Sequence, residues 1–185
     1  ATYDITYTTS GTCPASSNVT VTAITQDDAT FTTTPTCDGG TATITGTAGG
    51  TFTFTTVPGD GAMIDGATGT VTGGTSGATY DITYTTSGTC PASSSVTVTA
   101  NTIDDATFSL TPTCDGGTAT ILGTPGGTFT FSTIPGDGAV IDGVTGTITG
   151  GTSGATYDVQ YATSGGCAAS SNQSVTAITQ DDATF

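Results

Sequence analysis

The sequence contains no lysine, arginine, histidine, glutamate or tryptophan. Its 185 residues include 15 acidic side chains, all of them aspartate, so the formal net charge is −15. Nucleic-acid binding needs cationic side chains that displace counterions, and anionic membrane surfaces repel a negatively charged chain. Imidazole-based metal sites and most acid–base mechanisms are excluded by the same absences. We therefore predict no nucleic-acid partner, no membrane insertion and no enzymatic activity.

An internal repeat organises the chain. The segment ATYDITYTTSGTCPASS starts at Ala1 and again at Ala78, and a variant starts at Ala155, so the period is 77 residues. This period exceeds the ~20–50 residues of solenoid repeats and suits a small independent domain. Residues 1–77 and 78–154 differ at only 12 positions. Near-identical tandem copies favour a spacer or fibre, in which each module has the same role.

Each repeat reads as a series of short strands. Threonine, the most frequent residue, alternates with Val, Ile, Phe or Tyr, and turns rich in Gly, Pro and Asp separate these runs. The pattern predicts strands at residues 29–33, 41–45, 51–55, 62–65, 70–72, 79–85 and 95–100. About seven strands per repeat is an immunoglobulin-like number. The expected fold class is therefore all-β, with tandem immunoglobulin-like β-sandwich modules and threonine on the outward strand positions.

The joints between modules are placed at the paired aspartates, Asp27-Asp28, Asp104-Asp105 and Asp181-Asp182. With module boundaries at these joints, residues 28–104 and 105–181 are two complete repeats. Residues 1–27 are the C-terminal hairpin of a preceding repeat, and residues 182–185 are the start of the next one. The joints are short and contain no glycine or proline, which favours stiff coupling of neighbouring modules.

Three segments carry a resemblance to a known family. They are GTAGGTF at residues 46–52, IDGATGT at 64–70, and TTSGTCP at 85–91 with Tyr80 and Tyr84 before it. Together they resemble the tandem Ig-like repeats of giant cell-surface adhesin proteins of Bacteroidetes. The resemblance implies an extracellular, repetitive stalk, often exported by the type IX route, in which the tips rather than the repeats bind ligands. The complete loss of Lys and Arg departs from what such repeats are expected to show.

The five cysteines predict a disulfide framework in an oxidising compartment. The favoured pairs lie within modules, Cys37–Cys90 and Cys114–Cys167, and leave Cys13 for an upstream partner. A second alternative pairs Cys37 with Cys167, because the end of the first strand and the last hairpin of a seven-stranded sandwich lie at opposite poles. A third pairs Cys13 with Cys37. The sequence contains no C-x-x-C spacing, which makes metal binding by cysteine less favoured than disulfide formation.

The aspartates and threonines allow further site hypotheses. Carboxylates at the joints could bind Ca²⁺, with Asp27, Asp28, Asp104 and Asp105 as ligands, or they could cap turns and keep the surface soluble. Apart from this calcium, no cofactor is expected. Thr-x-Thr triplets suggest an ice-binding function. That function needs a flat, regular array of threonines, which a twisted sheet does not readily offer. Sequons at Asn18 and Asn172 are absent from the middle copy, which has Ser95 at the equivalent position.

The sequence as a whole predicts an extracellular, cell-surface structural repeat that forms the stalk or fibre of a large bacterial adhesin, stabilised by disulfides. The expected partners are neighbouring identical repeats or chains, with a surface or glycan ligand at a tip elsewhere. One alternative is a subunit of a non-covalent, donor-strand-like filament, because residues 1–27 form strands without a sandwich of their own. The other is a ligand- or ice-binding repeat.

Overall fold

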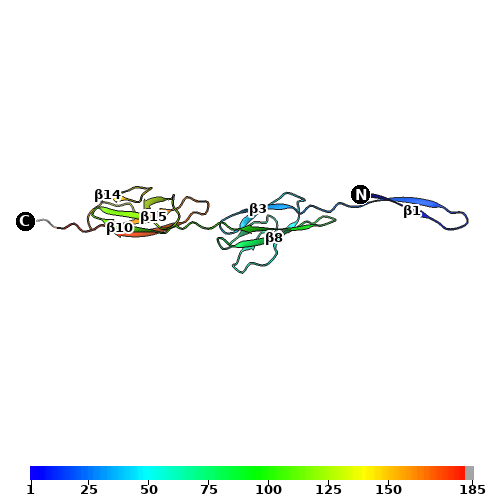
Figure 1. Ribbon diagram of the computed structural model, residues 1–185, viewed down its shortest axis with the longest axis horizontal. Coiled ribbons are helices and arrows are strands. Elements are labelled where there is room, and N and C mark those ends of the chain that lie inside the picture. The colour runs from blue at the N-terminus through cyan, green and yellow to red at the C-terminus, as the bar shows by residue number, and fades with distance from the viewer. Residues whose placement is uncertain (182–185) are drawn as a thin grey trace, which may run out of the picture. The chain divides into compact units, whose positions relative to one another are not determined.

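The structure, a computed structural model, describes residues 1–181 and is all-β (Figure 1). It divides into two compact units, Ala1–Ala100 and Asn101–Phe185. The described residues contain no helix that is long and apolar enough to cross a membrane. The predicted start of a further repeat, 182–185, lies outside the described residues.

The first unit contains a complete module of seven strands, which we call the first module. Its strands are β3 (Phe31–Pro35), β4 (Gly40–Ile44), β5 (Thr51–Phe54), β6 (Met63–Ile64), β7 (Val71–Thr72), β8 (Thr79–Thr85) and β9 (Ser93–Thr99). One sheet has the order β3-β4-β7-β6 and the other has the order β5-β8-β9. Labelled A to G along the chain, these are the ABED and CFG sheets of a constant-type immunoglobulin domain. The predicted immunoglobulin-like sandwich is confirmed.

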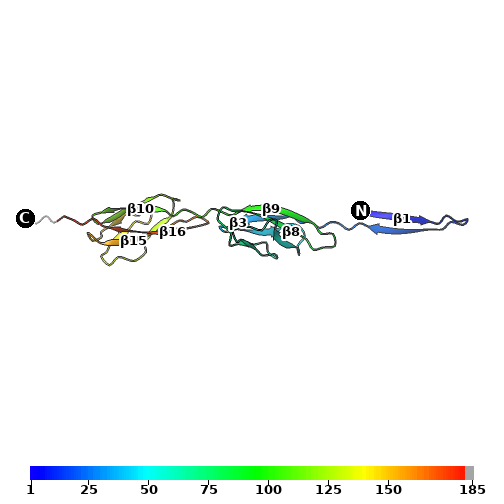
Figure 2. The ribbon, with the colours of Figure 1, turned by 90° about the horizontal axis from the view of Figure 1, so that it is seen from below.

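The second unit repeats this topology in what we call the second module (Figure 2). Its strands are β10 (Phe108–Thr113), β11 (Gly116–Ile121), β12 (Thr128–Phe131), β13 (Val140–Ile141), β14 (Ile148–Thr149), β15 (Thr156–Ala162) and β16 (Ser170–Thr176). The sheets are β10-β11-β14-β13 and β12-β15-β16. All strand pairs are antiparallel.

The core of each module comes from the inward positions of alternating strands. In β8, Tyr80, Ile82 and Tyr84 are buried, whereas the threonine and aspartate between them face outward or are half-buried. The rings of Phe52 and Tyr84 lie 4.5 Å apart, and that of Phe31 meets Phe52 edge-on at 5.4 Å. The second module repeats these contacts with the equivalent rings. Each module therefore closes a small aromatic core of its own.

The first unit begins with a hairpin that is not part of the first module. Strands β1 (Thr2–Thr8) and β2 (Ser16–Thr22) pair antiparallel over seven residue pairs, from Thr2 opposite Thr22 to Thr8 opposite Ser16. Every residue of both strands is exposed. The hairpin thus has the pairing of β8 and β9 without the burial that those strands have in the first module.

Candidate functional site

The aspartate pair that precedes the first module holds backbone groups of the loops around it. The N–H of Thr30 donates to Asp28 Oδ1 at 3.0 Å, and the N–H of Asp28 donates to the Thr47 hydroxyl at 3.0 Å. The N–H of Gly88 donates to Asp27 Oδ2 at 3.1 Å. These are the turn-capping roles that short acidic side chains take in loops.

The pair in the second module shares the arrangement of its second aspartate, Asp105, but not that of its first, Asp104. Both the N–H and the hydroxyl of Thr107 donate to Asp105 Oδ1, and these bonds lower the pKa of Asp105. Asp104 Oδ2 is buried and has no hydrogen-bond partner. Within residues 1–181, no three Asp or Cys side chains come together in a group that could hold a metal ion. Ca²⁺ takes about six to eight oxygen ligands, so each aspartate pair alone supplies too few, and calcium binding at Asp27, Asp28, Asp104 and Asp105 stays a prediction.

A buried tyrosine hydroxyl ties together two loops of each module. Tyr80 Oη donates to Asp60 Oδ2 at 2.6 Å, and the N–H of Thr75 donates to Tyr80 Oη at 2.8 Å and to Asp60 Oδ2 at 2.9 Å. The second module has the same cluster, made of Tyr157, Asp137 and Thr152. The tyrosine lies near the start of strand F and reaches back to the E–F loop, as in the tyrosine corner of immunoglobulin folds, with a carboxylate added.

These contacts shift the pKa values of both partners. The hydrogen bond from Tyr80, followed by the backbone bonds from Thr75 and Ala62, holds the pKa of Asp60 well below its usual range. Burial, followed by the hydrogen bond to Asp60, raises the pKa of Tyr80. The carboxylate therefore stays ionised and the phenol stays protonated across a wide pH range, which is the pairing that makes a short O–H···O⁻ bond.

The shifts predict how stability depends on pH. A depressed carboxyl pKa contributes stability above the unfolded-state value and loses it on acidification, so both modules should weaken as the pH falls below about 4. The raised pKa of Tyr80 and Tyr157 should destabilise the folded state as the pH rises above about 10. Chemical denaturation between pH 2 and 11 measures both limbs. With Asp60→Asn and Asp137→Asn, the acid limb should flatten relative to the parent chain; an unchanged acid limb would contradict the assignment.

The cysteines divide into two groups. Cys37 and Cys167 are disulfide-bonded, whereas Cys13, Cys90 and Cys114 carry free thiols. The pairs Cys37–Cys90 and Cys114–Cys167, favoured from the sequence, are therefore not formed in this structure.

The positions of the cysteines within one module explain this correction. In the first module, Asp27 N–H donates to the carbonyl oxygen of Cys90 at 2.9 Å, so Cys90 lies at the end where the chain enters the module. Cys37 follows β3, beyond five extended residues that alone span about 16 Å. A disulfide allows only about 4.4–6.8 Å between Cα atoms. In the second module Asp104 donates to Cys167 in the same way, and Cys114 follows β10.

Thiol labelling tests this division. We expect native chain to react with iodoacetamide at Cys13, Cys90 and Cys114, and Cys37 and Cys167 to react only after reduction. Tryptic cleavage is impossible without Lys or Arg, so the peptides would be made with an Asp-directed or chymotryptic protease. The remaining alternative, a peptide that contains both Cys37 and Cys167, stays a prediction that the same non-reducing map tests. Peptides joining Cys37 to Cys90 or Cys114 to Cys167 would contradict the correction.

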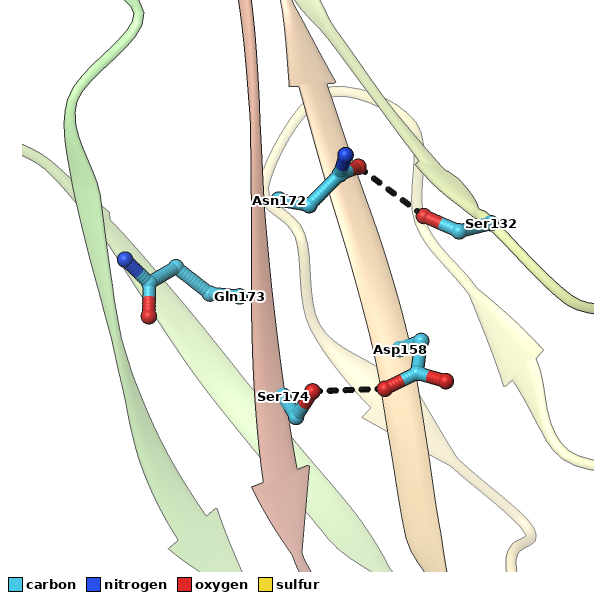
Figure 3. Close-up of a pocket in the computed structure, with 5 residues that line it drawn as sticks. All are labelled: Ser132, Asp158, Asn172, Gln173 and Ser174. Atoms are coloured by element: carbon cyan, nitrogen blue, oxygen red, sulfur yellow. Dashed lines mark hydrogen bonds between the residues drawn. The ribbon is translucent and has the colours of Figure 1, made fainter.

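The second module differs from the first on the outer face of its three-stranded sheet. The second module has a hollow that is lined by Ser132, Asp158, Asn172, Gln173 and Ser174 (Figure 3). The Ser132 hydroxyl donates to Asn172 Oδ1 at 3.0 Å, and Ser174 donates to Asp158 at 2.5 Å, whereas Gln173 extends from the other side of β16. The one carboxylate of this hollow, Asp158, accepts a hydrogen bond from Ser174 across the β15–β16 pair, as Asp81 accepts one from Thr97 in the first module, so this contact belongs to the strand pairing of both modules.

Comparison with known proteins adds little to this description. No protein family model matches the chain, and no curated protein matches its sequence. Among solved structures, the chain is similar to "Protocadherin Gamma B2 extracellular cadherin domains 3-6", with 11% sequence identity and a TM-score of 0.34. The match covers 98% of this chain and 60% of that chain. At this score the likeness supports no inference about function, and the immunoglobulin-like assignment rests on the strand order.

Proposed function

We propose that the chain is an extracellular structural repeat that forms the stalk or fibre of a large bacterial surface adhesin. The observation that carries the proposal is the repetition of one closed sandwich, with the same buried rings and the same tyrosine–aspartate cluster in both modules. Tandem copies of a binding domain also occur, but the feature that these two copies share most closely is a packed core. The two cores differ among their buried residues only by Val71 against Ile148 and Ile82 against Val159, so each module should have similar mechanical strength, which is what a spacer needs.

Two further features support an extracellular location. Cys37 and Cys167 are disulfide-bonded, and stable disulfides form in oxidising compartments outside the cytosol. The absence of Lys and Arg leaves no cleavage site for trypsin-like proteases, and the net charge of −15 keeps neighbouring fibres apart. The assignment to Bacteroidetes-type adhesins comes from the sequence resemblance alone.

The mechanism that we propose is mechanical. The last strand of the first module, β9, pairs with β8 over seven residue pairs and contacts β3, the first strand of the opposite sheet. A pull on the two ends of the module therefore acts on strands that are held along their length by hydrogen bonds and by the packed core. Such a module resists extension until these contacts break together.

Single-molecule force spectroscopy tests the proposal on the full chain, tethered by its two ends with all cysteines reduced. We expect two unfolding events of similar force, each releasing about 250 Å of contour length for a 77-residue repeat. A variant with Phe52→Ser should lose one event and keep the other. Smooth extension without force peaks would contradict a load-bearing role.

A filament subunit is the second candidate, because the β1–β2 hairpin exposes Tyr3, Ile5 and Tyr7, the residues that β8 buries at the equivalent positions. A donor-strand-like assembly would cover this face with another polypeptide. The length of the native gene product separates the two: thousands of residues favour a single-chain stalk, and a product near this length favours a polymer. A ligand- or ice-binding role has no comparable observation in its favour.

A further inference from the structure

The β1–β2 hairpin and the β8–β9 hairpin have almost the same sequence and opposite environments. Residues 1–23 and 78–100 differ only at Asn18, which corresponds to Ser95. Tyr3, Ile5 and Tyr7 are 59%, 58% and 69% exposed, whereas their counterparts Tyr80, Ile82 and Tyr84 are 2%, 0% and 0% exposed. A hairpin that is built for a core thus presents that core face to solvent. A contiguous apolar face of this kind marks a contact surface.

The first module shows what covers this face. Strand β5 pairs with the edge of β8 that β9 leaves open, with Phe54 opposite Ile82 and Phe52 opposite Tyr84. The Tyr84 hydroxyl donates to the carbonyl oxygen of Thr47 at 2.8 Å and accepts from the N–H of Gly50 at 2.9 Å. Residues 28–77 supply all of these contacts, together with the buried side chains of the opposite sheet.

The hairpin has the matching free groups. In the described chain β1 pairs only with β2, so the backbone groups on its other edge are unpaired. If a strand pairs with that edge of β1 as β5 pairs with β8, the counterpart of Phe54 lies opposite Ile5 and the counterpart of Phe52 lies opposite Tyr7.

We propose that the apolar face and free edge of the β1–β2 hairpin bind a further copy of the first half of the repeat, the segment equivalent to residues 28–77. The bound segment would add its β5 strand antiparallel to β1 by β-augmentation and close the core with its phenylalanines. The Tyr3 hydroxyl would then meet the carboxylate equivalent to Asp60, as Tyr80 does in the first module.

A second copy of the same hairpin is a poorer occupant. Two hairpins placed face to face would bring tyrosine hydroxyls against one another without the Asp60 and Thr75 groups that satisfy Tyr80. They would also lack the phenylalanine rings that fill the space beside Tyr84. Buried hydroxyls without partners cost free energy, so the half-repeat is the better complement.

The experiment adds a separate peptide, residues 28–77 with Cys37→Ser, to the full chain under reducing conditions. Calorimetry should show one peptide bound per chain, and hydrogen exchange at the amides of Thr2–Thr8 should slow about tenfold or more while β8 and β15 are unchanged. A fusion of residues 28–77 in front of Ala1 should give the same protection, and it tests the contact if the free peptide does not stay in solution.

Matched variants show whether the proposed contacts carry the binding. Phe52→Ser in the peptide and Tyr7→Ser in the chain should each weaken binding by more than about tenfold. Thr53→Ser and Asp4→Asn, on the outward faces, should leave it unchanged. The proposal is overturned if all four variants bind alike, if protection is absent from β1 in both formats, or if the chain dimerises through the hairpin and the peptide does not displace that contact.

Discussion

Replacing Phe52 with alanine is expected to lower the free energy of unfolding of the first module by about 3–5 kcal/mol. The side chain is 2% exposed, and its ring lies 4.5 Å from that of Tyr84 and 5.4 Å from that of Phe31. Gly69, at φ 68°, packs against the same ring, so no neighbouring side chain can move into the cavity from that side. A small domain has only about 5–15 kcal/mol of stability, so the loss should leave the module marginal.

Hydrogen exchange followed by denaturant titration measures each module separately. Phe129→Ala should have the same effect on the second module and none on the first, because the two cores consist of different residues. Phe54→Ala, at a half-buried position of the same strand, should cost clearly less. A loss at Phe52 below about 0.5 kcal/mol, the range of surface substitutions, would show that the ring is not a core element.

The strand pattern was the most predictable part of the fold. In β5 the alternation of threonine and phenylalanine placed both rings on one face, and the structure buries Phe52 fully and Phe54 partly. The first strand was predicted two residues early, at 29–33, and it ends at Pro35, opposite Gly40. A proline fits there because β3 is the edge strand of its sheet, where one side needs no ladder hydrogen bond.

The candidate site was less predictable, because its contacts join residues that are distant in sequence. Asp60 and Tyr80 are separated by 20 positions, and the β-strand periodicity that located Tyr80 contains no information about which loop its hydroxyl reaches. The cysteine pattern had the same weakness. Spacing alone favoured Cys37–Cys90, whereas the hydrogen bond from Asp27 to Cys90 places that residue at the other end of the module from Cys37.

Replacing Gly74 with alanine is expected to destabilise the first module by about 2–4 kcal/mol, through the tyrosine–aspartate cluster. A β-carbon at Gly74 would lie 2.0 Å from Tyr80 Oη and 2.8 Å from the carbonyl oxygen of Asp38. The backbone cannot withdraw easily, because Gly74 N–H donates to that carbonyl at 2.9 Å. Tyr80 would have to move, and the hydrogen bond from its hydroxyl to the Asp60 carboxylate would be lost.

A double variant separates the steric clash from other effects of the substitution. Tyr80→Phe removes the hydroxyl, the nearest atom to the new methyl group, and keeps the ring carbon Cζ, which would lie 2.6 Å from it. Gly74→Ala should therefore cost less in the Tyr80→Phe background than in the parent, by about 1 kcal/mol or more. Equal costs in the two backgrounds would mean that the clashes with Cζ and with the Asp38 carbonyl dominate. Gly151→Ala provides the matched test, since its β-carbon would lie 2.1 Å from Tyr157 Oη. Agreement between the modules would show that each repeat depends on the same close approach of a glycine to a tyrosine hydroxyl.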